Sequence, residues 1–348
     1  MTSPLYVNGS FLHVAIRGAT GSRGDVVLVG RGMTVNGGVP FGIWTGGNVR
    51  GVTIADLTIR DVYSHPIILN GGTQSPLIHN VRLVNAGQQF VKANPDGAGG
   101  GVDNGIVEYS VIEYDSTSRD DYTNGVDVHT GDNWIIRHNL FRNIRAPHGQ
   151  LAGPAILMWN ASTGTLVDGN TFIDCQREIA LGLIERTPDD HAGGVVRNNF
   201  IYRRAAIDGD SAVYVADSPG TQVLHNSILV SGTYQNPIEY RFPHTTGVLV
   251  ANNILDGRIA ARDGATGSVS GNYTTGSAAL FVNPAAGDLH LSPGAQVVIN
   301  TVAAPLASAG PDWDGHPRPA GATDTGADEY GGSTRTRPSS PRNFRIVR

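Results

Sequence analysis

Short runs of alternating apolar and polar residues fill most of this chain, and one motif recurs with them. In the motif an apolar residue is followed by two variable residues, Asn, one variable residue and a second apolar residue. Copies occupy 136–141, 167–172, 195–200, 223–228 and 249–254, and a last one begins at 269, which places Asn at 139, 170, 198, 226, 252 and 272. Earlier copies lack Asn and are centred on Leu57, Val81 and Ser110. The motif therefore repeats every 20 to 31 residues.

A repeat of this length, with two alternating runs per step, predicts one coil of a solenoid. Parallel pairing would stack successive coils about 4.8 Å apart, with the apolar residues inside. Asn side chains at equivalent turns would pass amide hydrogen bonds from coil to coil. We therefore predict an all-β fold, a single-stranded right-handed parallel β-helix of about ten coils.

The two ends of the chain depart from the repeat. Residues 1–50 contain strand-like runs in poorer register, as expected of a capping coil. We assign 1–285 to the β-helix and 286–330 to an irregular C-terminal cap whose acidic residues serve turns and capping. Residues 331–348 contain five arginines among Ser, Thr and Pro, and we interpret them as an Arg-rich flexible tail.

Composition narrows the classes of function. The 46 glycines and 19 prolines suit many short strands and tight turns. A net charge of −5 disfavours nucleic acid as a partner, since phosphate binding requires a basic surface. We expect neither a membrane span nor a signal peptide in this sequence, since it has no apolar run of suitable length, and the single Cys175 cannot form an internal disulfide.

Candidate chemistry emerges when the strands that precede the motif are aligned. The alignment sets Val91-Lys92-Ala93-Asn94 one coil below Val126-Asp127-Val128-His129. Alternate residues of a strand face outward, so Lys92, Asp127 and His129 would lie within reach of one sugar ring. Lys92 is the only lysine of the chain. We expect Lys92 and His129 to project into solvent, so that replacing either would abolish turnover and leave thermal stability nearly unchanged.

These residue types suit the removal of a proton beside a carboxylate. A uronic acid has an acidified C5–H, and its abstraction requires a base, a group that holds the enolate-like charge, and an acid for the leaving oxygen. His129 can serve as base or acid near neutral pH, Asp127 can orient it, and Lys92 can steady the developing charge or act as the base.

The segments 124–129 and 136–141 resemble the Gly-x-Asp-Pro-His segment and the following coil of bacterial mannuronan C5-epimerases. Those β-helix enzymes have a lysine one coil earlier, and the resemblance implies an active site of Lys92, Asp127 and His129. The strand around Lys92 is also similar to the lysine-bearing strand of β-helix alginate and chondroitin lyases. At the level of the fold, the resemblance to pectate-lyase-like proteins covers nearly the whole chain.

The chain differs from these families at several positions. Val128 replaces the proline, Asn124 stands where the epimerases have a tyrosine, and an acidic position is lost near Met158. The arginine of the lyases has no match in the strand, and the candidates to replace it are Tyr122, Arg137 and Arg145. The loop 117–124 is expected to hang over the site.

Further residues are candidates for sugar subsites because they lie on or near the outward columns. Aromatic stacking and charge pairing suit that role, and the candidates are Asn94, Arg145, His148, Trp159, Asn160, Tyr214, Glu239 and Arg241. No cofactor is expected; calcium is the one metal considered, with Asp103, Glu108 and Glu113 as its candidate ligands.

The leading hypothesis is a polysaccharide lyase that cleaves a uronic-acid-containing polysaccharide, with alginate among the candidates, by β-elimination. The alternatives are a uronan C5-epimerase, a glycoside hydrolase on an acidic glycan, and a non-catalytic carbohydrate-binding or adhesive β-helix. We expect an acidic polysaccharide partner, no nucleic acid, no membrane, and a monomer. A polymer substrate also favours a secreted or periplasmic protein of bacterial origin.

Overall fold

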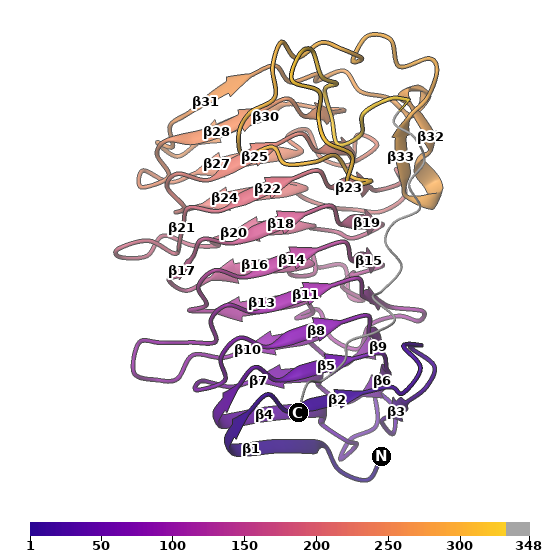
Figure 1. Ribbon diagram of the computed structural model, residues 1–348, viewed down its shortest axis with the longest axis vertical. Coiled ribbons are helices and arrows are strands. Elements are labelled where there is room, and N and C mark those ends of the chain that lie inside the picture. The colour runs from indigo at the N-terminus through magenta and orange to yellow at the C-terminus, as the bar shows by residue number, and fades with distance from the viewer. Residues whose placement is uncertain (332–348) are drawn as a thin grey trace.

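The computed structural model describes residues 1–331, so the Arg-rich segment assigned to 331–348 lies outside the described residues apart from Gly331. Three long parallel sheets run the length of the molecule (Figure 1). Sheet A has ten strands, which are β1 (Leu5–Leu12), β4 (Phe41–Arg50), β7 (His65–Leu69), β10 (Val91–Ala93), β13 (Val126–His129), β16 (Ile156–Trp159), β20 (Ile179–Leu181), β24 (Val213–Ala216), β27 (Ile238–Arg241) and β30 (Ile259–Arg262).

Sheets B and C form the other two sides. Sheet B contains β2 (Ala15–Arg17), β5 (Thr53–Ala55), β8 (Leu77–His79), β11 (Ile106–Glu108), β14 (Ile135–Arg137), β18 (Leu166–Asp168), β22 (Val195–Arg197), β25 (Gln222–Leu224), β28 (Val248–Ala251) and β31 (Gly267–Ser270). Sheet C contains β3 (Val27–Val29), β6 (Thr58–Val62), β9 (Arg82–Ala86), β12 (Val111–Glu113), β15 (Leu140–Arg142), β19 (Thr171–Ile173), β23 (Phe200–Tyr202), β26 (Ser227–Leu229) and β29 (Ile254–Leu255). A small bridge pairs β17 (Ser162–Thr163) with β21 (His191–Ala192).

The predicted right-handed parallel β-helix of about ten coils is confirmed, because each coil except the last adds one strand to each of the three sheets in sequence order. The expectation of two apolar runs per coil was incomplete, since every coil but the last has a strand in each of the three sheets. The repeated motif covers the strand of sheet B, the corner and the strand of sheet C. Sheet A is formed by the strands that precede the motif.

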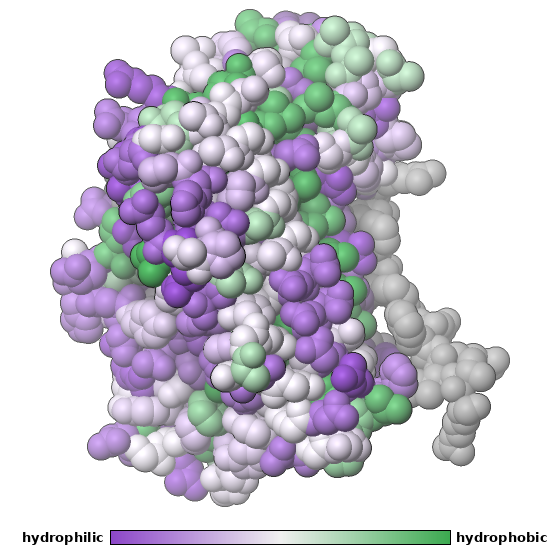
Figure 2. Space-filling view, turned by 90° about the vertical axis from the view of Figure 1, so that its left-hand side faces the viewer, coloured by the Kyte–Doolittle hydropathy of each residue, from purple (hydrophilic) through white to green (hydrophobic). Residues whose placement is uncertain are grey.

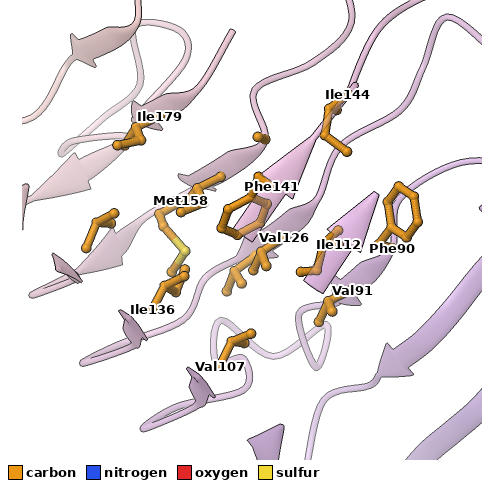
Figure 3. Close-up of a cluster of buried hydrophobic side chains, with 14 of the residues drawn as sticks. Phe90, Val91, Val107, Ile112, Val126, Ile136, Phe141, Ile144, Met158 and Ile179 are labelled. Atoms are coloured by element: carbon orange, nitrogen blue, oxygen red, sulfur yellow. The ribbon is translucent and has the colours of Figure 1, made fainter. Parts of the chain in front are cut away.

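One continuous apolar core fills the space between the three sheets. Figure 3 shows side chains from all three walls meeting there, among them Val126 and Met158 of sheet A, Ile136 of sheet B and Phe141 of sheet C. All four are fully buried. The ring of Phe141 stacks on that of Phe172 in the next coil, with centroids 4.9 Å apart. Similar side chains at equivalent positions of successive coils therefore stack on one another, and the core consists of one layer per coil.

The asparagine ladder is present, but two of its rungs were predicted one residue too early. It runs through Asn139, Asn170, Asn199, Asn226, Asn253 and Asn272, each amide oxygen accepting from the backbone N–H and side chain of the preceding rung. Ser110 extends it downward, since its N–H donates to Asn139. Asn198 and Asn252 instead occupy the preceding corner position, where φ is 53° and 60°. Asn accepts this left-handed conformation more readily than most residues.

The C-terminal segment packs on the side of the solenoid. It contains the 3₁₀ helices η1 (Ala278–Leu280) and η2 (Pro284–Ala286) and the antiparallel strands β32 (Phe281–Asn283) and β33 (Asp288–Leu291). Leu289 and Leu291 join a second apolar cluster with Phe200 and Leu229 of sheet C. The segment thus covers part of the outer surface of sheet C. All four residues of β31, the last strand of sheet B, stay exposed.

Among the described residues, no helix is long and apolar enough to cross a membrane. Figure 2 shows one face of the molecule, where hydrophilic side chains predominate and hydrophobic ones form small separate patches.

Candidate active site

Lys92, Asp127 and His129 meet on the outer face of sheet A, as the aligned strands predicted. Strands β10 and β13 are direct neighbours, and their register pairs Lys92 with Asp127. The residues on either side, Val91 and Ala93, are fully buried in the core. The alternation of the strand therefore turns Lys92 outward.

The three side chains form one contact network. Nζ of Lys92 lies 2.6 Å from Oδ2 of Asp127 and 2.6 Å from Nε2 of His129. Nε1–H of Trp159, one coil above, donates to Oδ1 of Asp127 at 3.0 Å. The Trp159 ring also makes an edge contact with the His129 ring, with centroids 4.5 Å apart. Both carboxylate oxygens of Asp127 are thus engaged.

The network is more deeply buried than the sequence suggested. Lys92 is 8% exposed and Asp127 is 0% exposed, whereas the side chain of His129 keeps 19% of its surface accessible. The expectation that Lys92 projects into solvent was therefore wrong. The next coil supplies the cover, because Trp159 packs over the carboxylate and the imidazole. His129 is the member of the network that a ligand can reach most readily.

Burial lowers the pKa of His129, and the neighbouring charge of Lys92 lowers it further, against an opposing effect of Asp127. His129 is therefore neutral at neutral pH. His65, at the start of β7, belongs to the same electrostatic neighbourhood. Burial first, and Lys92 among smaller causes, lower its pKa to about 4, while Nδ1 lies 3.0 Å from the carbonyl oxygen of Gln89. Sequence reasoning missed His65, which precedes the aligned outward position.

The segment 114–125, which leads from sheet C into β13, brings Tyr122 to this region. Tyr122 is 53% exposed, and burial together with the charge of Asp127 raises the pKa of its phenol. His148, from the corresponding segment of the next coil, pairs with Asp121 at 3.2 Å and is largely exposed. These two predicted residues thus lie on adjacent loops that enter sheet A.

Arg137 and Arg145 do not belong to the site. Arg137 is the last residue of β14 in sheet B, where it pairs with Glu108 at 2.6 Å. Arg145 follows β15 of sheet C and donates to Asn143. Both were misplaced because they lie in or after the motif strands, which form sheets B and C, whereas the site lies on the preceding strand in sheet A.

The candidate calcium ligands are likewise not brought together. Glu108 is occupied by Arg137 and by His79, whose Nδ1 lies 2.8 Å from Oε1. Glu113 lies on sheet C between Arg82 and Arg142. Asp103, in the turn before β11, accepts from the backbone N–H of Asp132. Their carboxylates are used in separate contacts on different walls, so they do not form one cation site.

A cavity of about 190 Å³ lies farther along the same sheet and gathers three of the predicted subsite residues, Tyr214, Glu239 and Arg241. Its other lining residues are Pro154, Arg177, Ile179, Leu183, Asp210, Ser211, Tyr234 and Arg262. The arginines are paired with carboxylates, Arg262 with Glu239 at 2.9 Å and Arg177 with Asp210 at 3.1 Å. Ser211 is 3% exposed and its Oγ has no hydrogen-bond partner among the described residues.

Asn94 and Asn160 lie at the ends of strands. Nδ2 of Asn94 donates to Asn70 at 3.0 Å, and the N–H of Asn160 donates to Asp190 at 2.8 Å. Asp190 also accepts from Nε of Arg186 at 2.7 Å, and the Arg186 guanidinium lies 6.0 Å from the centre of the Trp159 ring. The sequence offered no signal for Arg186, because it lies in an irregular segment between β20 and β21.

Comparisons with known proteins find distant matches among solved structures. No protein-family model matches the sequence, and a search of curated proteins finds no significant match. Among solved structures, an alginate lyase from Paenibacillus sp. str. FPU-7 aligns at 15% identity over 79% of this chain and 91% of its own, with a TM-score of 0.49. The pectate lyase Pel9A aligns at 13% identity over 93% and 87%, with a TM-score of 0.40.

Two further solved structures broaden the range. The surface adhesin PfbA of Streptococcus pneumoniae aligns at 14% identity over 67% of this chain and 62% of its own, with a TM-score of 0.38. The A-module of the mannuronan C-5 epimerase AlgE4 of Azotobacter vinelandii aligns at 14% over 78% and 87%, with a TM-score of 0.31. At these values the likeness concerns the β-helix alone, a scaffold that lyases, an epimerase and an adhesin share.

Proposed function

We propose that the chain cleaves a uronic-acid-containing polysaccharide by β-elimination at Lys92, Asp127 and His129. The observation that carries the proposal is one ammonium group in contact with both a buried carboxylate and a neutral, partly exposed imidazole. Proton abstraction beside a carboxylate requires a base together with a positive charge that stabilises the enolate-like intermediate. This network supplies both on a surface of sheet A.

Each residue has a distinct role in this reaction. A substrate carboxylate would compete for the ammonium of Lys92 and free the Nε2 lone pair of His129, which then accepts the C5 proton. The C5–H electron pair forms the C4–C5 double bond as the C4–O4 bond breaks. The departing O4 takes a proton from the Tyr122 phenol, which its raised pKa keeps protonated. Asp127, fully buried, holds Lys92 in place.

The arrangement disfavours hydrolysis. A glycoside hydrolase requires two carboxyl groups about 5–10 Å apart on either side of the glycosidic bond. Asp127 is fully buried with both oxygens engaged, and Glu239 lies four strands away in sheet A, about 19 Å at 4.8 Å per coil. Glu239 is also 1% exposed and bonded to Arg262, Tyr234 and Asn236.

The cavity around Tyr214 lies three coils, about 14 Å, beyond β13 on the same sheet. It extends the proposed binding surface along the stacking direction, which suits a polymer bound lengthwise. We accordingly expect an extended acidic polysaccharide as the partner of a monomeric enzyme that works outside the cytoplasm.

Incubation with a panel of uronans, followed by ultraviolet absorbance of unsaturated uronate, tests the proposal. We expect new absorbance with at least one polymer, and a loss of about 100-fold or more in His129→Asn. His13→Asn is the matched control, because this exposed histidine lies between β1 and β2, outside the site, at a positive φ that Asn accepts, and the variant should retain full activity.

Three outcomes would replace the lyase assignment. Deuterium incorporation at C5 in heavy water without chain cleavage would identify a C5-epimerase, which removes the same proton. New reducing ends without absorbance would identify a hydrolase. Binding without any turnover would leave a carbohydrate-binding or adhesive protein.

A further inference from the structure

A second cluster of polar side chains lies at the edge where the chain passes from sheet A to sheet B. Asp189 belongs to the segment between β20 and β21, Asp217 follows β24 directly, and His244 follows β27. These are three successive coils, so the solenoid stacks one ligand-bearing turn on the next. One ligand atom of each residue lies within 4.8 Å of the other two.

Asp217 is the centre of the cluster. It is 0% exposed, and its Oδ2 accepts from the backbone N–H groups of Arg186 at 2.7 Å and Asp190 at 3.0 Å. Its Oδ1 accepts no hydrogen bond from any described residue and points to Nδ1 of His244, 3.4 Å away. A buried carboxylate oxygen without a donor is costly, which indicates that a positive partner belongs there.

We propose that Asp189, Asp217 and His244 bind one divalent transition-metal ion of the zinc or manganese class. Two carboxylate oxygens and one imidazole nitrogen form a mixed ligand set that such ions accept, whereas calcium and magnesium prefer oxygen alone. Two atoms 3.4 Å apart, each about 2.1 Å from a common ion, subtend an angle of about 108°, which is nearly tetrahedral. Asp189 lies 4.0 Å from His244 and has to approach by about 0.6 Å to reach the same angle.

A similar cluster elsewhere shows the contrast. His290 lies with Asp314 and Asp328 in the C-terminal segment, yet its Nδ1 is 2.5 Å from Asp288 and its Nε2 is 3.1 Å from Asp314. Burial acts to lower the pKa of His290, but the hydrogen bonds to Asp314 and Asp288 outweigh it and raise the pKa to about 9. A protonated imidazole with both nitrogens engaged offers no lone pair to a metal.

The ion would connect the segment 182–190 to the two coils above it. That segment carries Arg186, whose guanidinium lies beside the Trp159 ring and whose charge contributes to the lowered pKa of His129. The role of the metal is thus positional, since it would fix a cationic loop next to the candidate active site. The site stands independently of the proposed lyase function.

Calorimetric titration of the full chain, after treatment with a chelator, tests the proposal with Zn²⁺, Mn²⁺, Ca²⁺ and Mg²⁺ in turn. We expect one Zn²⁺ or Mn²⁺ per chain and at least 100-fold weaker binding in His244→Gln. His244 is exposed, so this variant should fold, whereas Asp217→Asn alters a buried group and serves as a second test. His290→Gln and His148→Gln are the matched controls and should bind as the wild type does.

Two further measurements, one of absorption and one of hydrogen exchange, test the site independently of affinity. Co²⁺ bound at the site should show ligand-field absorption that is lost in His244→Gln. Hydrogen exchange across 183–190 should slow when the ion binds. Absence of transition-metal binding by the wild type, or unchanged binding by both His244→Gln and Asp217→Asn, would overturn the metal site. Binding without slower exchange would overturn its positional role.

Discussion

Replacing Lys92 with methionine should destabilise the protein, because it removes the cationic partner of a carboxylate that is 0% exposed. Removing one partner of a buried ion pair costs about 3–5 kcal/mol. Trp159 still donates to Asp127 in the variant, and methionine fills most of the lysine volume. We therefore expect a loss near the lower end of that range, about 3 kcal/mol.

A second substitution separates the buried charge from the packing. In Lys92→Met with Asp127→Asn, the amide oxygen still accepts from Trp159, but no charge remains buried without a partner. We expect the double variant to recover about 2 kcal/mol relative to Lys92→Met alone, a coupling typical of residues in contact. Neither Lys92→Met nor the double variant should show the proposed lyase activity, because both lack the ammonium group.

Urea unfolding of the wild type, both single variants and the double variant forms a double-mutant cycle and supplies these energies. Nuclear magnetic resonance titration of His129 gives an independent readout. Because Lys92 contributes to lowering the pKa of His129, that pKa should rise in Lys92→Met. A cost below about 1 kcal/mol, or no recovery in the double variant, would refute the buried-pair argument.

Three further predictions concern stability and binding. Burial lowers the pKa of His65 to about 4 and those of His191 and His225 to about 3, so below pH 6.5 the unfolded chain binds protons at these residues that the folded chain does not. Near pH 5 the three histidines should lower the free energy of unfolding by about 4 kcal/mol for each pH unit of acidification, and Asp328, whose pKa burial raises to about 6, should offset about 1 kcal/mol of this. Urea unfolding across pH measures the net slope, and a free energy of unfolding that does not fall on acidification would contradict the neutral buried state of these histidines. Asn170→Ala should cost about 2–4 kcal/mol, measured by urea unfolding, because it leaves ladder groups on both sides without partners, and a cost below about 1 kcal/mol would contradict this. Ser211→Ala should change stability by less than about 0.5 kcal/mol, since its Oγ is unpartnered, but should raise KM several-fold if the cavity holds a sugar; an unchanged KM would remove Ser211 from the subsite.

The sequence predicted the β-helix and the proximity of Lys92, Asp127 and His129 because both depend on a recurring motif and on the alternation of strand residues. A repeat fixes which residues occupy equal places in neighbouring coils, and the alternation of a strand fixes which side chains face outward. The prediction of the ladder was wrong at the two places where two asparagines are adjacent, 198–199 and 252–253. Either member satisfies the pattern, and only the backbone shows that the first adopts positive φ while the second forms the rung.

The remaining site residues depend on features that no period encodes. The burial of Lys92 depends on cover from the next coil, and Arg137 was misplaced because its strand belongs to the motif and forms sheet B, not sheet A. Arg186, Asp217 and His244 lie in irregular turns of unequal length. Their convergence follows from how these turns fold back at one edge, which the spacing of residues does not determine.

Because the candidate active site and the Tyr214 cavity belong to different coils of one sheet, the separation between them is a whole number of coil heights. Inserting one complete coil between the paired strands β16 and β20 would lengthen that separation by about 4.8 Å, but it would also part Trp159 from Arg186 and Pro154 from the rest of the cavity lining. The number of coils thus sets the distance between the candidate active site and the Tyr214 cavity. Under the proposed function, a variant of this kind would change the length of oligosaccharide that reaches both.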